Sequence, residues 1–397
     1  MKTFKEGDNM DTKQLYDKRL DVFQKSMNRE ESDWMPTAMF NNGGGFFYGG
    51  KTAYDYENDH EGYARALNSF LEEMYLDVCC LCGMTSSPLI SRVFPTAENR
   101  LAADGTLTHL QSSPMKADEY DQLIADPRAF IANVLLPRKY PYLFENREKT
   151  RELLKLYAAA EVDCMVLQMG ANQKHLAEHY GIPTVMNLGA GIINTPLDHL
   201  FDYFRGFRGT LTDLRRIPAE KMQAALDTIW EYKCAPVVAQ PYDPSLGFVF
   251  QPCHIPAYLS PKQYKELYWP YEKRFAEWIA ANGGKIFLIL EGKWGQMADC
   301  FLDAPKDSFV LAVDDDDVFD IYNRLGHHQI ICGGLRLADT RLKKTDEIKD
   351  HIKRVVDTCA PGGGFLFMTD KAFVTPGDVS KTLIECYNFA HEYSKKS

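Results

Sequence analysis

The sequence predicts an α/β fold, a (β/α)8 TIM-type barrel, because strand-like runs alternate with helical stretches through its second half. Four short apolar runs each end in a polar residue or glycine, and a helix-like stretch follows each of them. Short continuous apolar runs are typical of parallel strands buried on both faces. The runs cover residues 285–290, 308–313, 329–331 and 364–368, and they lead into Glu291, Asp314, Cys332 and Thr369.

The polar residues at the ends of these runs predict the position of the active site. In a (β/α)8 barrel, residues at the C-terminal ends of the strands build the site. We therefore expect Glu291, the acidic run 314–317, Cys332 and Asp370 to face one cavity.

Further strands and helix starts support the same fold. Additional strand candidates cover residues 77–82, 163–168, 184–188 and 248–251, which gives about eight strands, the number that a closed barrel requires. A capping serine followed by proline and glutamine predicts a helix that begins after Ser260. Pro218 predicts another helix start, and so does the segment 375–378.

The chain is expected to form one barrel domain over residues 1–397. Residues 1–75 are predicted to be an N-terminal helical and loop extension, with helix in the first 30 residues. Residues 85–145 lack a clear alternation of strands and helices. We expect this segment to form a cap-like excursion over the barrel.

Composition excludes several classes of protein. The formal net charge of -10 argues against a nucleic-acid-binding surface, which needs a basic stripe. The sequence contains no apolar run long enough to span a membrane, and the polar start does not resemble a signal peptide. The ten cysteines are too sparse for a disulfide framework and fit reduced thiols. A cytoplasmic enzyme is therefore expected.

Three residues are candidates for catalysis. Glu291 lies at the end of an apolar run, where partial burial raises the pKa of a carboxyl and makes it a general acid/base or a metal ligand. His254 follows the run 248–251 and is a residue type suited to acid/base chemistry and metal binding. Asp314 heads the acidic run. The alternatives are a helix-capping carboxylate, a histidine bonded to backbone and a solvated acidic loop.

Other residues are candidates for binding. Trp294, just after Glu291, and Phe40, beside a glycine-rich stretch, are expected to contact substrate. Arg205 could clamp a carboxylate or phosphate, or form a surface ion pair. Together, His254, Glu291 and Cys332 would make a zinc site with one open position, although a buried structural cysteine is an equal alternative for Cys332.

Five segments of the sequence together carry a resemblance to a known family. They are MKADEYDQLIADP (115–127), PLDHLFDYFRGFRGTLTDLRRIPAEK (196–221), LSPKQYKELYWPYEKR (259–274), FLILEGKW (287–294) and the end of the chain from Gly333 through PGGGFLF to the last helix. They span most of the chain in order and agree with the barrel prediction. At these segments the chain resembles the uroporphyrinogen decarboxylase superfamily, and especially its corrinoid-dependent methyltransferases and O-demethylases.

Two motifs that are absent from this sequence indicate which branch of the superfamily it resembles. True decarboxylases carry an arginine-rich N-terminal motif, and the corresponding residues 36–43 contain no arginine. Relatives that activate coenzyme thiols often hold zinc with His-x-Cys and a later cysteine. Here Ile289 and Glu291 stand at the first pair, and the late cysteine falls near Lys371. The demethylase-type branch fits better.

The resemblance therefore implies a methyltransferase that moves a methyl group between a small methylated compound, such as an aryl methyl ether, and a corrinoid protein. Its corrinoid would be carried on that partner, zinc is the candidate metal, and a homodimer remains an expectation. A decarboxylase of a tetrapyrrole-like or other carboxylic acid is one alternative. It would require Arg205, Arg208, Arg215 and Arg216 to line the cavity. A non-catalytic ligand-binding barrel is another.

Overall fold

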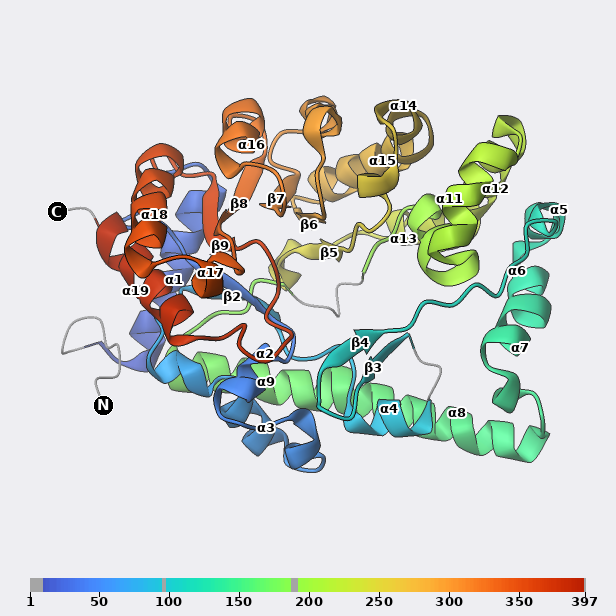
Figure 1. Cartoon of the computed structure of the whole chain (residues 1–397), viewed down its shortest axis with the longest axis horizontal. Coiled ribbons are helices and arrows are strands. Elements are labelled where there is room, and N and C mark those ends of the chain that lie inside the picture. Colours follow the sequence, from blue (N-terminus) through green and yellow to red (C-terminus); the bar gives the residue numbers. More distant parts are fainter. Residues whose placement is uncertain (1–9, 95–97, 187–191, 396–397) are drawn as a thin grey trace.

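The second half of the chain builds a parallel sheet whose strands follow one another in sequence. The computed structural model describes residues 10–94, 98–186 and 192–395. Within them, a five-stranded sheet has the order β5-β6-β7-β8-β9, and every neighbouring pair is parallel (Figure 1). Its strands are β5 (Val249–Gln251), β6 (Ile286–Leu290), β7 (Phe309–Val313), β8 (Ile330–Leu335) and β9 (Phe365–Thr369). The strands predicted in this half of the sequence are confirmed.

Two N-terminal strands extend the parallel pairing. β1 (Ala38–Asn41) pairs with β2 (Val78–Cys82), the latter as predicted, while β1 was not expected from its sequence. Isolated parallel bridges join Thr37 to Phe367 and Cys79 to Thr184. A further parallel bridge joins Met186 to Phe248, next to β5. The predicted strand 184–188 is thus represented by single bridges, and its residues 187 and 188 lie outside the described part.

Helices follow the strands and lie along the outer side of the sheet in Figure 1. Ser260 accepts a hydrogen bond from the Gln263 amide and caps its helix, as predicted. Pro218 precedes α12, also as predicted. The main helices of this half are α11 (Gly206–Arg216), α12 (Ala219–Ile229), α14 (Pro261–Gln263), α15 (Trp269–Ala281), α16 (Val318–Leu325), α17 (Asp339–Leu342), α18 (Thr345–Cys359) and α19 (Lys381–Ser394).

The first half of the chain is largely helical. The predicted N-terminal helix is α1, and its Asp11 cap accepts a hydrogen bond from the Gln14 amide. Residues 85–145 hold the antiparallel hairpin of β3 (Asn99–Leu101) and β4 (Leu107–His109) among short helices. The helices of this half are α1 (Thr12–Met27), α2 (Gly44–Tyr48), α3 (His60–Leu67), α4 (Pro88–Val93), α5 (Tyr120–Ala125), α6 (Pro127–Phe130), α7 (Leu136–Lys139), α8 (Arg147–Val162) and α9 (Met169–His175).

The predicted strand at 163–168 is wrong. Asp163–Gln168 is a helical segment that joins α8 to α9, so the chain forms one long rod that ends at Gly181, whose φ is 64° (Figure 1). Val166 is 60% exposed, which a buried strand would not allow. Periodicity alone does not separate a short apolar run in a strand from one in a helix. Here, the continuous helix on both sides decides the conformation.

The predicted helix start at 375–378 lies too early. α19 begins at Lys381, and Ser380 caps it by accepting a hydrogen bond from the Leu383 amide. Asp378 instead accepts hydrogen bonds from the amides of Val374 and Thr375, which closes a turn before the helix. Within the described residues, no helix is both long and apolar enough to cross a bilayer.

Candidate active site

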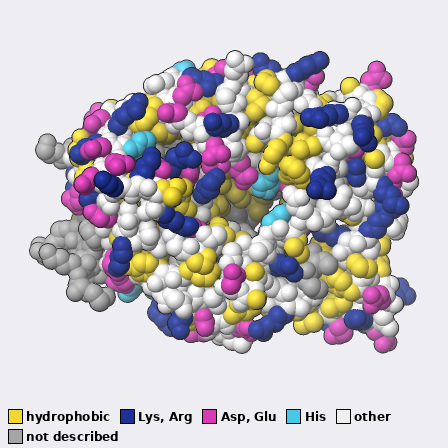
Figure 2. Space-filling model, viewed as in Figure 1, with side chains coloured by type: hydrophobic (Ala, Val, Ile, Leu, Met, Phe, Trp, Pro, Cys, Tyr) yellow, Lys and Arg dark blue, Asp and Glu magenta, His cyan; other side chains and the backbone are white. Residues whose placement is uncertain are grey.

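A cavity of about 840 Å³ opens at the C-terminal ends of the strands. His254 comes three residues after β5, Glu291 directly after β6, Asp314 after β7 and Asp370 after β9, and all four line this cavity. Because parallel strands end at the same edge, residues far apart in sequence meet here. Figure 2 shows the hollow near the centre of the face, with hydrophobic, acidic and histidine side chains around it.

His254 is held between two carboxylates. Its Nδ1 lies 3.0 Å from Oδ1 of Asp202, and its Nε2 lies 3.7 Å from Oε1 of Glu291. Burial works against the charged imidazolium, yet the hydrogen bond and charge of Asp202, together with Glu291, raise the pKa of His254 to about 9. The imidazolium form therefore prevails near neutral pH, with Nε2–H directed toward the side of Glu291.

Glu291 is partly exposed in the cavity, with 41% of its side chain accessible. Burial raises the pKa of this carboxyl, and the charges of Asp314 and Asp202 add to the rise while His254 opposes it. The next residue, Gly292, has a φ of 72°, and a Cβ there would lie 2.9 Å from Cβ of Ala257. Only glycine fits this turn, which directs Glu291 from the strand end into the cavity.

A second layer of buried groups supports the loop that carries His254. Asp198 is fully buried, and its Oδ1 accepts hydrogen bonds from the backbone amides of His254 and Ile255. Its Oδ2 accepts one from the Tyr268 hydroxyl at 2.6 Å. That hydroxyl also lies 3.0 Å from Sγ of Cys253. Burial and the charge of Asp202 raise the pKa of Asp198.

Asp314 forms an ion pair on the cavity wall. Its Oδ1 lies 2.5 Å from Nζ of Lys371, and its Oδ2 accepts a hydrogen bond from the amide of Gly292. It therefore positions the loop next to Glu291 as well as contributing charge. The rest of the acidic run is structural: Asp316 accepts a hydrogen bond from the Trp294 amide, and Asp317 caps α16.

The other wall of the cavity is aromatic. Phe40, which was predicted to contact substrate, lines it, with its ring 5.6 Å from that of Phe250. Farther along, Phe201, Phe207 and Tyr258 pack ring against ring, and Tyr258 is 54% exposed. This wall offers a planar or apolar substrate a large contact area.

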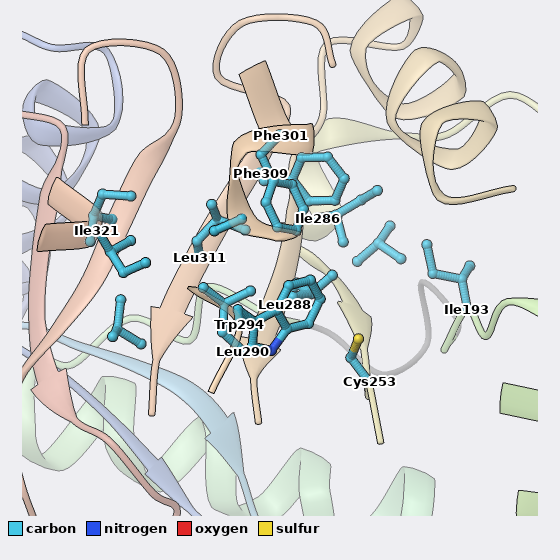
Figure 3. Close-up of a cluster of buried hydrophobic side chains, with 14 of the residues drawn as sticks. Ile193, Cys253, Ile286, Leu288, Leu290, Trp294, Phe301, Phe309, Leu311 and Ile321 are labelled. Atoms are coloured by element: carbon cyan, nitrogen blue, oxygen red, sulfur yellow. The ribbon is translucent and has the colours of Figure 1, made fainter. Parts of the chain in front are cut away.

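The structure does not bring Trp294 to the cavity. The indole is buried in the hydrophobic core shown in Figure 3, next to Leu288 and Leu290, with Phe301 5.6 Å away. Its Nε1 donates to the backbone carbonyl of Glu291. The predicted substrate contact is therefore replaced by a packing role, because the turn after β6 points the indole back into the core.

Arg205 also lies outside the cavity lining. Its guanidinium forms a two-point ion pair with the buried Asp213 and donates a hydrogen bond to the carbonyl of Met115. These partners occupy the donors that a substrate carboxylate would need. The arginine therefore connects α11 to the segment that precedes α5. Its role is that of a structural ion pair, the alternative to a substrate clamp.

Cys332 does not meet His254 and Glu291. It was expected at a strand end, but β8 continues to Leu335, so Cys332 lies within the strand between Ala312 and Leu366. It is fully buried, and burial raises the pKa of its thiol well above the usual range. Cys332 is therefore a buried structural cysteine, the alternative to a metal ligand.

The predicted zinc set does not fit this arrangement. Among the described residues, no group of three or more histidine, cysteine, aspartate or glutamate side chains is placed to hold a metal ion. A structural or catalytic zinc needs at least three converging protein ligands. His254 has one carboxylate on each side, and the thiol that would complete the set is inside the sheet.

Sequence reasoning missed several residues that shape the site. Asp198 and Asp202 lie four positions apart in one helical stretch, a spacing that places them on the same helix face, and that was the available signal. Tyr268 gave no signal of its own. His109 reaches the cavity from the β3–β4 hairpin, with its ring 6.4 Å from that of His254. Its position depends on the tertiary placement of the hairpin.

Comparison with known proteins gives a structural likeness only. No family model and no curated protein matches the chain. Among solved structures, the chain is similar to a methyltransferase from Methanosarcina mazei, with a TM-score of 0.58 and 13% sequence identity. The match covers 97% of this chain and 99% of the other. Over nearly its whole length, the chain therefore shares the fold of that methyltransferase.

Proposed function

We propose that the protein is a methyltransferase that moves a methyl group between a small methylated donor, such as an aryl methyl ether, and a corrinoid carried by a partner protein. The proposal rests mainly on the position of His254, whose imidazolium lies between the carboxylates of Asp202 and Glu291. All three residues line a cavity whose other wall is aromatic. The shared fold with a methyltransferase supports the reaction class. We propose the cytoplasm as its location.

The proposal includes a closed (β/α)8 barrel of the uroporphyrinogen decarboxylase type. The supporting observation is that parallel pairing continues beyond both edges of the five-stranded sheet. Thr37, just before β1, bridges to β9, and the bridges at Thr184 and Met186 connect β2 with the start of β5. With residues 184–186 as the remaining strand, such a ring would contain eight strands, the number that this barrel needs.

The residues of this chain would bind the methyl donor and donate one proton to its leaving group. The aromatic wall holds the apolar part of the donor, with its methyl group toward the open side. A corrinoid on a docked partner would supply the nucleophile for the methyl group. As the carbon–oxygen bond breaks, its electron pair stays on the oxygen, and Nε2–H of His254 donates a proton there. Asp202 stabilises the charged imidazole before transfer and holds the ring afterwards.

The geometry gives little support to a decarboxylase. Arginines would have to grip substrate carboxylates, yet Arg205 is engaged by Asp213. Arg208, Arg215 and Arg216 are exposed, and none of the four is among the described residues that line the cavity. The acidic lining would also repel an anionic substrate.

The direct test is methyl transfer in solution. Purified protein is incubated with Co(I) cobalamin and a panel of methylated ethers and amines, and methylcobalamin is followed by its absorption spectrum. We expect methylcobalamin from at least one donor. With an ether donor, we also expect His254→Gln to lower the rate about 100-fold, the lower end of what a positioned general acid contributes. Absence of methylcobalamin with every donor would contradict the proposal.

A further inference from the structure

The cavity has a surplus of negative charge. Among the described residues, six carboxylates line it. Four of them have a cationic partner: Glu98 pairs with Lys139, Asp202 with His254, Asp314 with Lys371 and Asp378 with Arg341. The other two are Glu291 and Asp370. A carboxylate that is paired with a cation contributes little net electrostatic potential to the cavity. Glu291 and Asp370 therefore determine whether the cavity favours a cationic or an anionic ligand.

The negative charges of Glu291 and Asp370 are not fully neutralised by a basic side chain. Glu291 has His254 3.7 Å away, but that imidazole is already bonded to Asp202 at 3.0 Å. Asp370 accepts a hydrogen bond from the amide of Leu337, and in the described part of the chain it forms no ion pair with a basic side chain. Burial raises the pKa of both carboxyls, while nearby positive charges oppose the rise: His254 and Lys371 act on Glu291, and Lys371 and Arg336 act on Asp370.

The remaining histidine does not offset this charge. His109 lines the cavity, and burial lowers its pKa, so the imidazole is neutral near pH 7. Lys371 is committed to Asp314 at 2.5 Å. A cation that enters the cavity would therefore gain electrostatic stabilisation, whereas an anion would meet repulsion.

Three aromatic rings in the same cavity provide a second contact suited to a cation. Phe207 lies edge-on to both neighbours, 5.6 Å from Phe201 and 5.0 Å from Tyr258. Phe201 and Tyr258 are nearly parallel at 6.2 Å. Tyr258 is 54% exposed, so part of its ring is open to a ligand. Aromatic faces attract ammonium groups through their quadrupole, and such clusters bind methylated ammonium groups.

We propose that the methyl donor is a cation, a methylated ammonium compound bound by Phe201, Phe207 and Tyr258 and by the carboxylates of Glu291 and Asp370. This inference rests on the proposed methyltransferase function and narrows its donor class. In the transfer, the nitrogen–methyl bond breaks and its electron pair stays on the nitrogen. A corrinoid on the partner would supply the nucleophile for the methyl group, and a neutral amine would leave. No proton is needed for bond cleavage, and His254 can protonate the amine afterwards.

Binding can be tested without any corrinoid. Calorimetry compares choline with 3,3-dimethylbutan-1-ol, its neutral carbon isostere, and with 4-methoxybenzoate as an anion. We expect choline to bind at least about tenfold more tightly than the isostere, since cation–π and Coulombic attraction both act on it alone. Equal binding of the isostere, or tighter binding of the anion, would overturn the inference.

Variants locate the site. Tyr258→Leu should weaken choline binding about tenfold, while Tyr258→Phe keeps the ring and the affinity. Tyr232→Leu, at an exposed tyrosine that does not line the cavity, is the matched control. Glu291→Gln should weaken binding of choline but not of the isostere, and the exposed Glu266→Gln should change neither. Unchanged choline affinity in both Tyr258→Leu and Glu291→Gln would contradict the assignment.

Different experimental outcomes would contradict the cationic donor and the methyltransferase function on which it rests. If methyl ethers give methylcobalamin while choline shows no preference over its isostere, the cationic donor is wrong and the methyltransferase proposal stands. If choline binds as expected and no ether or ammonium donor transfers a methyl group, the methyltransferase proposal is wrong and the cation site remains.

Discussion

His254 and Glu291 lie at the ends of neighbouring parallel strands, and Nε2 of the first is 3.7 Å from Oε1 of the second. Thirty-seven positions of sequence separate these residues, yet the register of β5 and β6 places both at the same edge. Asp202 approaches His254 from a helical segment on the other side. Each of these three side chains therefore comes from a different part of the fold.

The pKa of His254 should depend on Asp202. Asp202→Asn removes the charge that offsets burial, so the pKa should fall from about 9 toward or below the ordinary value of about 6.5. The C2 proton of the imidazole, followed by NMR against pH, measures this directly. Asp227→Asn, a change of the same type away from the cavity, should leave the titration unchanged.

The same contact should make stability depend on pH. Because the folded-state pKa of His254 is raised, its contribution is complete below pH 6.5 and is lost as pH rises through about 9. The difference in free energy of unfolding between wild type and Asp202→Asn should shrink over this range. Denaturant titrations at pH 6, 7.5 and 9 measure it, and a difference that grows with pH would contradict the assignment.

Arg205 should matter for stability and not for binding. Arg205→Ala leaves the carboxylate of Asp213, which is 2% exposed, without its cation, so we expect a loss of about 3 kcal/mol in the free energy of unfolding. Arg205→Ala combined with Asp213→Asn should cost less than the sum of the two single changes. Donor affinity should be unchanged in the single variant, and a selective loss of affinity would restore the substrate-clamp hypothesis.

Cys332 should behave as a core residue. Cys332→Ala removes one buried atom from the sheet, and we expect a loss of about 1 kcal/mol in the free energy of unfolding. The metal content of the purified protein and its rate of methyl transfer should equal those of wild type. Zinc present in wild type and lost in this variant would contradict the account of the metal site.

Gly292 should be needed for the position of Glu291. Its φ of 72° opposes alanine, and so does the 2.9 Å distance that an alanine Cβ would have to Cβ of Ala257. Gly292→Ala should cost about 2 kcal/mol in stability. Gly283→Ala has the same positive φ with open space around it, so it separates backbone strain from displacement of Glu291. Only Gly292→Ala should slow methyl transfer beyond its effect on folding.

Much of the sheet was predictable because buried parallel strands leave a local signal. The apolar runs before Glu291 and Asp314 are strands β6 and β7, and the polar residue after each run does face the cavity. The run at 163–168 carries the same local signal and is a helix, because its conformation depends on the helices on either side. The error at Cys332 came from a strand end placed four residues too early, at residue 331 and not at Leu335.

Long-range packing explains what the sequence did not reveal about the site. Asp202 and His109 belong to a helical segment and a hairpin whose approach to His254 depends on tertiary structure. Trp294 is three residues from Glu291 and yet points into the core, since the turn at Gly292 separates their directions. Which of two nearby polar or aromatic residues faces a cavity depends on turn geometry, and composition does not encode it.

The most direct test of the central claim compares methyl transfer to Co(I) cobalamin by wild type, His254→Gln and Cys332→Ala, with one methyl ether that wild type turns over. The account predicts methylcobalamin from wild type and Cys332→Ala at equal rates and about a 100-fold lower rate from His254→Gln, with its fold intact by circular dichroism. Equal rates for His254→Gln and wild type, or no methylcobalamin from wild type with any donor, would contradict it.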